Sequence, residues 1–203
     1  MSDVLQFDPI THTYTLRGRR LESVTQVLED VGISDFSMLP PSTRNEALRR
    51  GSVVHEAIAL DIEDDLDDSS VPEDYMGYVL AARRFRAERQ FEVELHEHRF
   101  YHPQFFYSGT LDAKGTAVIN SQRRKVILDW KSGVASSWVR YQLAAYCGFF
   151  PSPGAELRIC VEIHKDGTYR IFEFPAAEFR ADFDVFLSAL TVMRVKREEK
   201  RLR

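Results

Sequence analysis

The chain has 203 residues, of which 44% are hydrophobic and 12% aromatic, so its composition is that of a folded globular protein and excludes intrinsic disorder. No apolar run approaches the roughly 18 residues that cross a bilayer, and residues 1–4 do not begin a secretory signal, so we expect a cytoplasmic protein. Cys147 and Cys160 lie in apolar segments and are expected to be buried free thiols. Two cysteines are too few for a four-cysteine iron–sulfur cluster or zinc site.

The formal net charge of −4 has a local origin. Residues 61–74 contain eight acids and no base, so the remainder of the chain carries a formal charge of +4. We interpret this segment as a solubilising loop, with repulsion of nucleic acid or binding of a partner as alternatives. Residues 194–203 contain six bases and two acids, which indicates either a solvated helix end or a contact with a phosphate backbone.

The first half of the chain predicts a hairpin followed by helices. Ser23 occupies the N-cap position of the first helix, and Gly32 ends it. Val54, Ile58 and Ile62 form an i, i+4 apolar stripe on the second. The expected elements are a β-hairpin over 7–24 with Gly18 in its turn, a helix over 24–31, a helical region from 40 to 62, an exposed loop or frayed helix end over 61–74, and a helix over about 73–90.

The second half changes to a β-type period. The expected elements are strands over 91–102, 107–119 and 125–131, a helix over 137–149, strands over 156–164 and 168–175 joined by a turn at 165–167, and a final helix from about 176. This order predicts an α/β fold in which a central mixed β-sheet is flanked by helices.

A charged pair follows a strand that reads as fully buried. Residues 126–128 are continuously apolar, and Asp129 and Lys131 come directly after them. Side chains two residues apart on a strand share a face, and buried unpaired charge is costly, so this pair is either a partly buried ion pair or a functional group.

A second acid lies on the preceding strand. Asp112 follows Gly109-Thr110-Leu111. If the two strands are neighbours, Asp112 and Asp129 converge on one cation, and two carboxylates suit Mg²⁺ or Mn²⁺. Lys131 would then position or help deprotonate an attacking water. The alternative is that Asp112 is a turn residue.

Two helices add further candidates. His55 lies one turn after Gly51, and a neutral imidazole is a good metal ligand, although a core or surface histidine fits the same pattern. Gln142 and Tyr146 are four residues apart, so they share a helix face and could bind a phosphate or support Lys131. Ordinary packing of a buried tyrosine is the alternative.

The motifs occur in a characteristic order, GSVVH, YSGTLD, VILDWKSG and QLAAY. In this order they resemble the RecB-like branch of the PD-(D/E)xK nuclease superfamily, which includes the RecB and AddB nuclease domains, phage recombination exonucleases and the mitochondrial genome-maintenance exonuclease. The resemblance covers residues 45–150. The opening hairpin resembles one found in phage-encoded members.

The resemblance implies a restriction-endonuclease-like core with Mg²⁺ or Mn²⁺ as cofactor. It implies that the side chains of His55, Asp112 and Asp129 and the carbonyl of Trp130 are metal ligands, and that Lys131 is catalytic. Further catalytic residues would be Gln142, Tyr146 and Glu97, with Glu94 as competitor of Glu97. Ser132 and Trp130 stand where Thr and Tyr are more usual. We expect one domain over 1–203, with the hairpin and first helix at 1–35, the catalytic core at 45–175 and the C-terminal helix with its basic tail at 176–203.

The function implied by the resemblance is metal-dependent hydrolysis of DNA, by an exonuclease of phage or prophage recombination or replication. The expected partner is single- or double-stranded DNA, in the cytoplasm of a bacterial host cell, with no membrane. A homo-oligomer and phage recombination or replication proteins are further partners by analogy. The alternatives are a structure-specific or flap endonuclease of the same fold, and an inactive DNA-binding or protein-interaction module.

Overall fold

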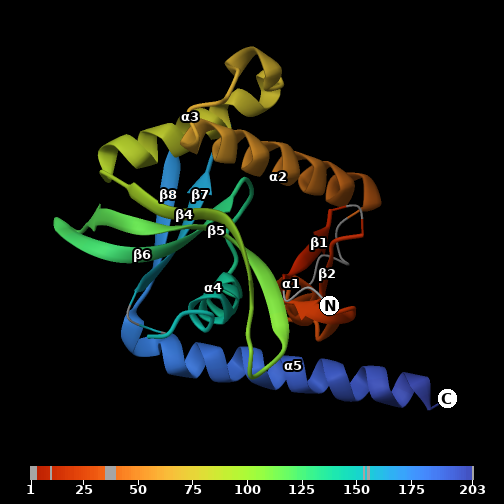
Figure 1. Cartoon of the computed structure of the whole chain (residues 1–203). Helices are drawn as coiled ribbons and strands as arrows, with labels where there is room; N and C mark the ends of the chain where they lie inside the picture. The colour runs from red at the N-terminus through yellow and green to blue at the C-terminus, as the bar shows by residue number, and fades with distance from the viewer. Residues whose placement is uncertain (1–3, 10, 35–39, 153, 155, 203) are drawn as a thin grey trace.

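The computed structural model describes residues 4–9, 11–34, 40–152, 154 and 156–202. Ile10 of the predicted hairpin, Arg203 of the basic tail and the domain limits at 1–3 and 35 lie outside them. The strands are β1 (Gln6–Asp8), β2 (Thr13–Leu16), β3 (Arg19–Ser23), β4 (Glu92–Tyr101), β5 (Tyr107–Ile119), β6 (Gln122–Lys131), β7 (Leu157–Ile163) and β8 (Tyr169–Phe174). The helices are α1 (Val24–Asp30), α2 (Pro41–Ile62), α3 (Glu73–Glu88), α4 (Val139–Cys147) and α5 (Phe179–Arg201), with short 3-10 helices η1 (Asp68–Ser70) and η2 (Ala176–Glu178) (Figure 1).

The eight strands form one mixed sheet. Its order is β1-β2-β3-β5-β6-β7-β8, and β4 pairs with β5 as well. The β3–β5 and β6–β7 pairs are parallel and the others are antiparallel. Helices α2 and α3 cover one face, while α1, α4 and α5 cover the other (Figure 1). The predicted α/β fold with a central mixed sheet flanked by helices is therefore confirmed.

Strand β5 has an opening along one of its edges. Ser108 pairs with β4 on one side and with β3 on the other, whereas Ala113 pairs with β4 and with β6. Strands β3 and β6 therefore share one edge of β5. The segment 109–112 lies between them, so its backbone and side chains can face groups other than a neighbouring strand.

Strand β6 lies between β5 and β7 in the sheet, and both of its faces are covered by helices. Val126, Leu128 and Trp130 pack into the core beneath α2 and α3, whereas Ile127 packs toward α4 and α5. The side chain of Asp129, which alternates with them, is 1% exposed. The sequence prediction of a strand buried on both faces is confirmed, and it brings a charged pair into the interior.

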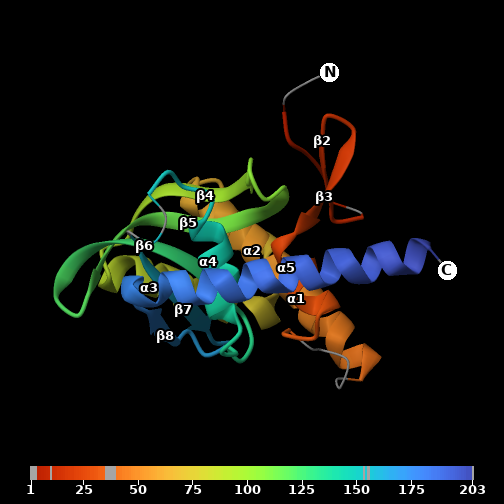
Figure 2. The same cartoon turned by 90° about the horizontal axis from the view of Figure 1, so that it is seen from below.

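The N-terminal segment contains more β-structure than predicted. The hairpin is present as β2 and β3, with Arg17 and Gly18 of its turn both at positive φ, as a tight two-residue turn requires. The structure adds β1 on its outer side and joins β3 to β5. Figure 2 shows this three-stranded unit projecting from the body of the molecule beside β4 and β5. Cys147 and Cys160 are buried and unpaired, as predicted.

Most of the acidic segment is exposed, as predicted, and α2 ends within it at Ile62, but some of its acids are paired. Asp61 is in α2, its side chain is 12% exposed, and it binds Arg83 and Arg86 of α3. Asp68 of η1 also binds Arg83. Part of the acidic charge therefore fastens α2 to α3. Across the described part of the chain, every helix is too short or too polar to span a bilayer.

Candidate metal and catalytic site

Three side chains from separate elements converge at the opening of β5. His55 comes from α2, Glu97 from β4 and Asp112 from β5, and each has a donor atom within 4.8 Å of the other two. His55 Nδ1 lies 3.6 Å from Asp112 Oδ2 and 3.7 Å from Glu97 Oε1. One imidazole and two carboxylates directed at one point form a donor set that fits a divalent cation such as Mn²⁺ or Mg²⁺.

The backbone of Trp130 completes this cluster. Its N–H donates to Asp112 Oδ2 at 2.8 Å, and its carbonyl oxygen lies 3.1 Å from His55 Nε2. Regular pairing between β5 and β6 ends two residues before Trp130, at the pair of Ala113 and Leu128. Because the strands part there, the polar groups of Trp130 bind site residues in place of a strand partner.

The structure distinguishes between the two candidate glutamates. Glu97 lies in the cluster with His55 and Asp112, whereas Glu94 lies outside it and forms an ion pair with Lys114. Strand β4 has a register shift between Val93 and Leu95, and Glu97 has a φ of 42°. These two irregularities set the direction of each glutamate, and the regular alternation used in sequence reasoning contains neither.

Gln142 of α4 joins the two charged residues of β6. Its Nε2 donates to Asp129 Oδ1 at 2.8 Å, and its Oε1 accepts from Lys131 Nζ at 3.3 Å. The ammonium group also forms an ion pair of 2.7 Å with Asp129 Oδ2. The orientation of the amide is fixed by chemistry, because only the nitrogen can donate to a carboxylate and only the oxygen can accept from an ammonium.

Tyr146 supports this arrangement from the next turn of α4. Its hydroxyl oxygen accepts from Gln142 Nε2 at 3.0 Å, and its side chain is buried. A Cβ atom at Gly109 would lie 2.8 Å from Tyr146 Cε1. Glycine is therefore required at position 109 so that the ring can pack against β5, which accounts for this residue of the G-T-L-D motif.

The site concentrates negative charge. Burial acts to lower the pKa of His55, but Asp112, Glu97 and Asp129 outweigh it and raise the pKa to about 9. Burial raises the pKa of Asp112 to about 7, with His55 opposing the shift and Asp129 reinforcing it. Burial lowers the pKa of Lys131, but the neighbouring carboxylates raise it overall. Three acids facing one imidazole and one ammonium are the environment that a divalent cation would neutralise.

The predicted site residues thus occupy one region, in two groups. His55, Glu97, Asp112 and the Trp130 carbonyl form the donor cluster, whereas the carboxylate of Asp129 lies outside it, bound by Lys131 and Gln142. Asp129 is close enough for its charge to act on His55 and Asp112. The alternative placing of Asp112 in a turn is wrong, because it lies within β5. The alternative ion pair between Asp129 and Lys131 is present, and it is part of the site.

Comparison with protein families finds no match, and comparison with curated proteins finds none either. Among solved structures, the chain is similar to an alkaline exonuclease (LHK-Exo) from Laribacter hongkongensis, at 15% identity, 89% coverage of this chain, 94% of that chain and a TM-score of 0.33. LHK-Exo in complex with dAMP is 15% identical, with 90% of this chain and 95% of that chain covered and a TM-score of 0.34. The protein SSO0001 is 17% identical, with 82% of this chain and 74% of that chain covered and a TM-score of 0.33.

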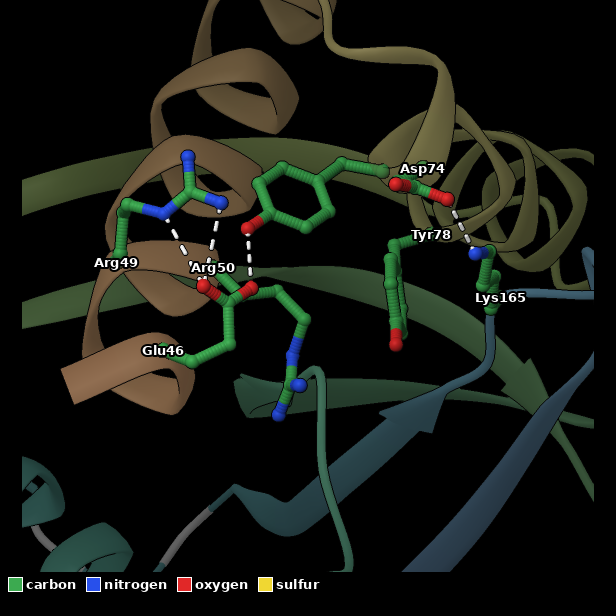
Figure 3. Close-up of a pocket in the computed structure, with 7 residues that line it drawn as sticks. Glu46, Arg49, Arg50, Asp74, Tyr78 and Lys165 are labelled. Atoms are coloured by element: carbon green, nitrogen blue, oxygen red, sulfur yellow. Dashed lines mark hydrogen bonds and ion pairs between the residues drawn. The ribbon is translucent and has the colours of Figure 1, made fainter. Parts of the chain in front are cut away.

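A pocket of about 210 Å³ lies between α2 and α3 (Figure 3). Most of its charges are paired within it. Glu46 binds Arg49 and the hydroxyl of Tyr75, and Asp74 binds Lys165. Its lining residues are Glu46, Arg49, Arg50, Asp74, Tyr75, Tyr78 and Lys165.

Arg50 differs from the other cations of this pocket. Its guanidinium lies 5.8 Å from the ring centre of Tyr78, and its Nε lies 3.4 Å from the hydroxyl oxygen of Ser132, the residue after Lys131. It forms no ion pair within the described ranges. An arginine whose charge is not matched by a carboxylate, next to the end of β6, is available to an anionic ligand. Sequence reasoning did not identify Arg50, because nothing in the sequence distinguishes it from its neighbour Arg49.

Proposed function

We propose that this protein is a divalent-metal-dependent nuclease that hydrolyses the phosphodiester bonds of DNA. The observation that carries the proposal is the convergence of His55, Glu97 and Asp112 at the opening of β5. Lys131, held by Asp129 and Gln142, supplies an ammonium group on the adjacent strand. The order of the motifs along the chain, with its resemblance to the RecB-like branch of PD-(D/E)xK nucleases, supports the same activity.

The proposed metal ligands are His55, Asp112, Asp129 and the carbonyl of Trp130, with Glu97 added by its position in the cluster. Oxygen-rich donor sets suit Mg²⁺ or Mn²⁺, and the imidazole favours the softer Mn²⁺. A divalent cation bound there would lower the pKa of a water molecule and offset the charge that develops on the phosphate. Asp129 stays in the proposed set because its charge already acts on His55 and Asp112.

The chain's own residues would then divide the remaining work. The neighbouring carboxylates raise the pKa of Lys131, so in this structure it is an ammonium near neutral pH. It would orient the attacking water and stabilise the negative charge of the transition state. Gln142 and Tyr146 would be positioning residues. Gln142 is hydrogen-bonded to Asp129 and Lys131, and Tyr146 is hydrogen-bonded to Gln142. Neither residue belongs to the donor cluster.

The experiment that tests the proposal is release of nucleotides from a labelled oligonucleotide with Mg²⁺ or Mn²⁺ and with EDTA. We expect Lys131→Ala to lower kcat by about 100-fold or more while DNA binding is retained, because one preorganised charge is worth that much in comparable sites. Lys114→Ala is the matched control. Lys114, like Lys131, is paired with a carboxylate, but its partner is Glu94 of β4 and the pair lies outside the cluster. Turnover of the Lys131 variant equal to that of the control rejects the assignment.

An exonuclease of phage or prophage recombination or replication is the proposed biological role, from the resemblance of the motifs. A structure-specific or flap endonuclease has the same chemistry, and a covalently closed circular DNA separates the two, because an exonuclease leaves it intact. Absence of metal-dependent cleavage on all single- and double-stranded substrates would favour an inactive binding module.

A further inference from the structure

Three aromatic rings gather on the N-terminal unit formed by β1, β2 and β3, beside the site. The ring centres of Phe7 and Tyr14 are 4.7 Å apart, and His12 makes edge contacts with both, at 5.2 Å from Phe7 and 5.9 Å from Tyr14. Tyr14 is buried, Phe7 is half-buried and His12 is exposed. The cluster therefore has a buried base and an open side, which an ordinary core cluster lacks.

Tyr14 connects this cluster to the strand that carries Asp112. Its hydroxyl shares a hydrogen bond of 2.7 Å with the hydroxyl of Thr110. Thr110 and Asp112 are two residues apart on β5, so their side chains share a face and lie about 7 Å apart along the strand. The aromatic cluster is thus adjacent to the metal cluster, at the same opening of β5.

Arg99 adds an available charge to the cluster. Its guanidinium carbon lies 4.8 Å from the ring centre of Phe7, and β4 pairs Arg99 with Thr110. The side chain is exposed, and it has no carboxylate partner within the described residues. An arginine stacked on an aromatic ring and free of ion pairs can contact a nucleobase or a phosphate.

His12 is held against these rings by its backbone. Its φ of 49° is in the left-handed region, which residues other than glycine rarely adopt. The residue before it, Thr11, donates two hydrogen bonds to the carboxylate of Asp8, from its backbone N–H and from its hydroxyl. An exposed imidazole in edge contact with two other rings is the type of surface on which flat ligands stack.

We propose that Phe7, His12 and Arg99 form a stacking platform for a nucleobase of the strand whose phosphate enters the metal cluster. The inference rests on the proposed nuclease function and makes it more specific. Aromatic rings and arginines bind single strands by stacking, whereas bases inside a duplex are already stacked on each other. The site therefore acts on a single-stranded segment or on an opened end of a duplex.

The test compares a fluorescein-labelled 12-mer of thymidylate with a 12-mer of the same length whose sugars carry no base. Binding is followed by anisotropy with Ca²⁺, with every variant placed in the Lys131→Ala background to suppress cleavage. The background protein should bind the thymidylate strand more tightly than the abasic strand. Phe7→Ala should weaken thymidylate binding about 5- to 100-fold, because this is the loss of affinity that corresponds to one base stacked on an aromatic ring. It should leave binding of the abasic strand unchanged.

Phe106→Ala is the matched control. Phe106 is also exposed and carries a stacked arginine, Arg19, at 5.3 Å, but it lies before β5 and outside the cluster. His12→Ala repeats the test at an exposed position, in case Phe7→Ala does not fold. The platform is rejected if neither Phe7→Ala nor His12→Ala reduces the preference for thymidylate, or if Phe106→Ala reduces it equally.

The two proposals fail in different ways. A wild-type protein that cleaves DNA with metal, while the background protein binds thymidylate and abasic strands equally, overturns the platform and leaves the nuclease. A wild-type protein that neither cleaves nor binds either strand overturns both.

Discussion

Gln142 of α4 is hydrogen-bonded to Asp129 of β6, with Nε2 2.8 Å from Oδ1. The oxygen of the same amide accepts a hydrogen bond from Lys131, so one uncharged side chain bridges the carboxylate of Asp129 and the ammonium of Lys131. Without it, the buried carboxylate would keep the ammonium as its remaining partner among these contacts. The ammonium, which already contacts Asp129 at 2.7 Å, would then lose its second partner, and its position would be less well defined.

We therefore expect Gln142→Leu to lower kcat about tenfold and to change KM little, because the loss concerns the position of Lys131 in the transition state and not binding of the ground state. Steady-state kinetics on an oligonucleotide measure this. Gln122→Leu, a surface change at the start of β6, is the control. A raised KM with unchanged kcat would show that Gln142 binds substrate instead.

The central strand and its acids could be predicted from the sequence, because a run of apolar residues followed by Asp129 and Lys131 has few structural solutions. The motif order also indicated His55, Asp112 and Gln142. Glu97 could be named but not distinguished from Glu94, because the distinction depends on a register shift and a left-handed backbone in β4. The contact of Tyr14 with Thr110 could not be predicted. It joins residues 96 apart in sequence through a short parallel pairing that no local pattern encodes.

Metal binding should release protons. With the pKa of His55 raised to about 9, its imidazole is protonated at neutral pH and a cation must displace that proton. Affinity for Mn²⁺ should therefore rise with pH, by up to about tenfold per pH unit for one linked proton, and level off above pH 9. Asp112, whose pKa is raised to about 7, adds a second linked proton below that pH.

Calorimetry at pH 7 in two buffers of different ionisation enthalpy measures the protons released. His102→Gln is the control, because His102 lies outside the cluster and burial lowers its pKa. Equal apparent enthalpies in the two buffers, together with an affinity that does not vary between pH 6 and 9, would exclude His55 as a ligand.

Arg50 should contribute to DNA binding more than its neighbour Arg49. The charge of Arg49 is matched by Glu46 (Figure 3), whereas Arg50 lies next to Ser132, the residue after Lys131. We expect Arg50→Ala to raise KM for DNA at least threefold and to reduce the slope of log KM against log salt by about one, as the loss of one phosphate contact does. Arg49→Ala is the matched control, with a salt slope close to that of the wild type. Equal slopes in the two variants would place Arg50 outside the DNA path.

Stability should depend on an ion pair remote from the proposed chemistry. Arg158 of β7 is fully buried, and its Nη1 lies 2.7 Å from Asp182 Oδ2 of α5, while Arg140 of α4 binds the other oxygen of that carboxylate at 2.7 Å. Asp182 thus fastens α4 and α5 to the sheet. Its removal leaves a buried guanidinium without its counter-charge.

We expect Asp182→Ala to lower the free energy of unfolding by about 3–5 kcal/mol, because the cost of an uncompensated buried charge exceeds the value of the pair itself. Asp184→Ala, two residues further along α5, is the control. Asp184 is half exposed and pairs with the exposed Arg180, so its loss should change stability by less than about 1 kcal/mol. Urea unfolding followed by circular dichroism measures both variants. If their stabilities agree within error, Arg158 must be compensated by its bonds to the backbone carbonyls of Arg140 and Pro175, and the ion pair contributes little.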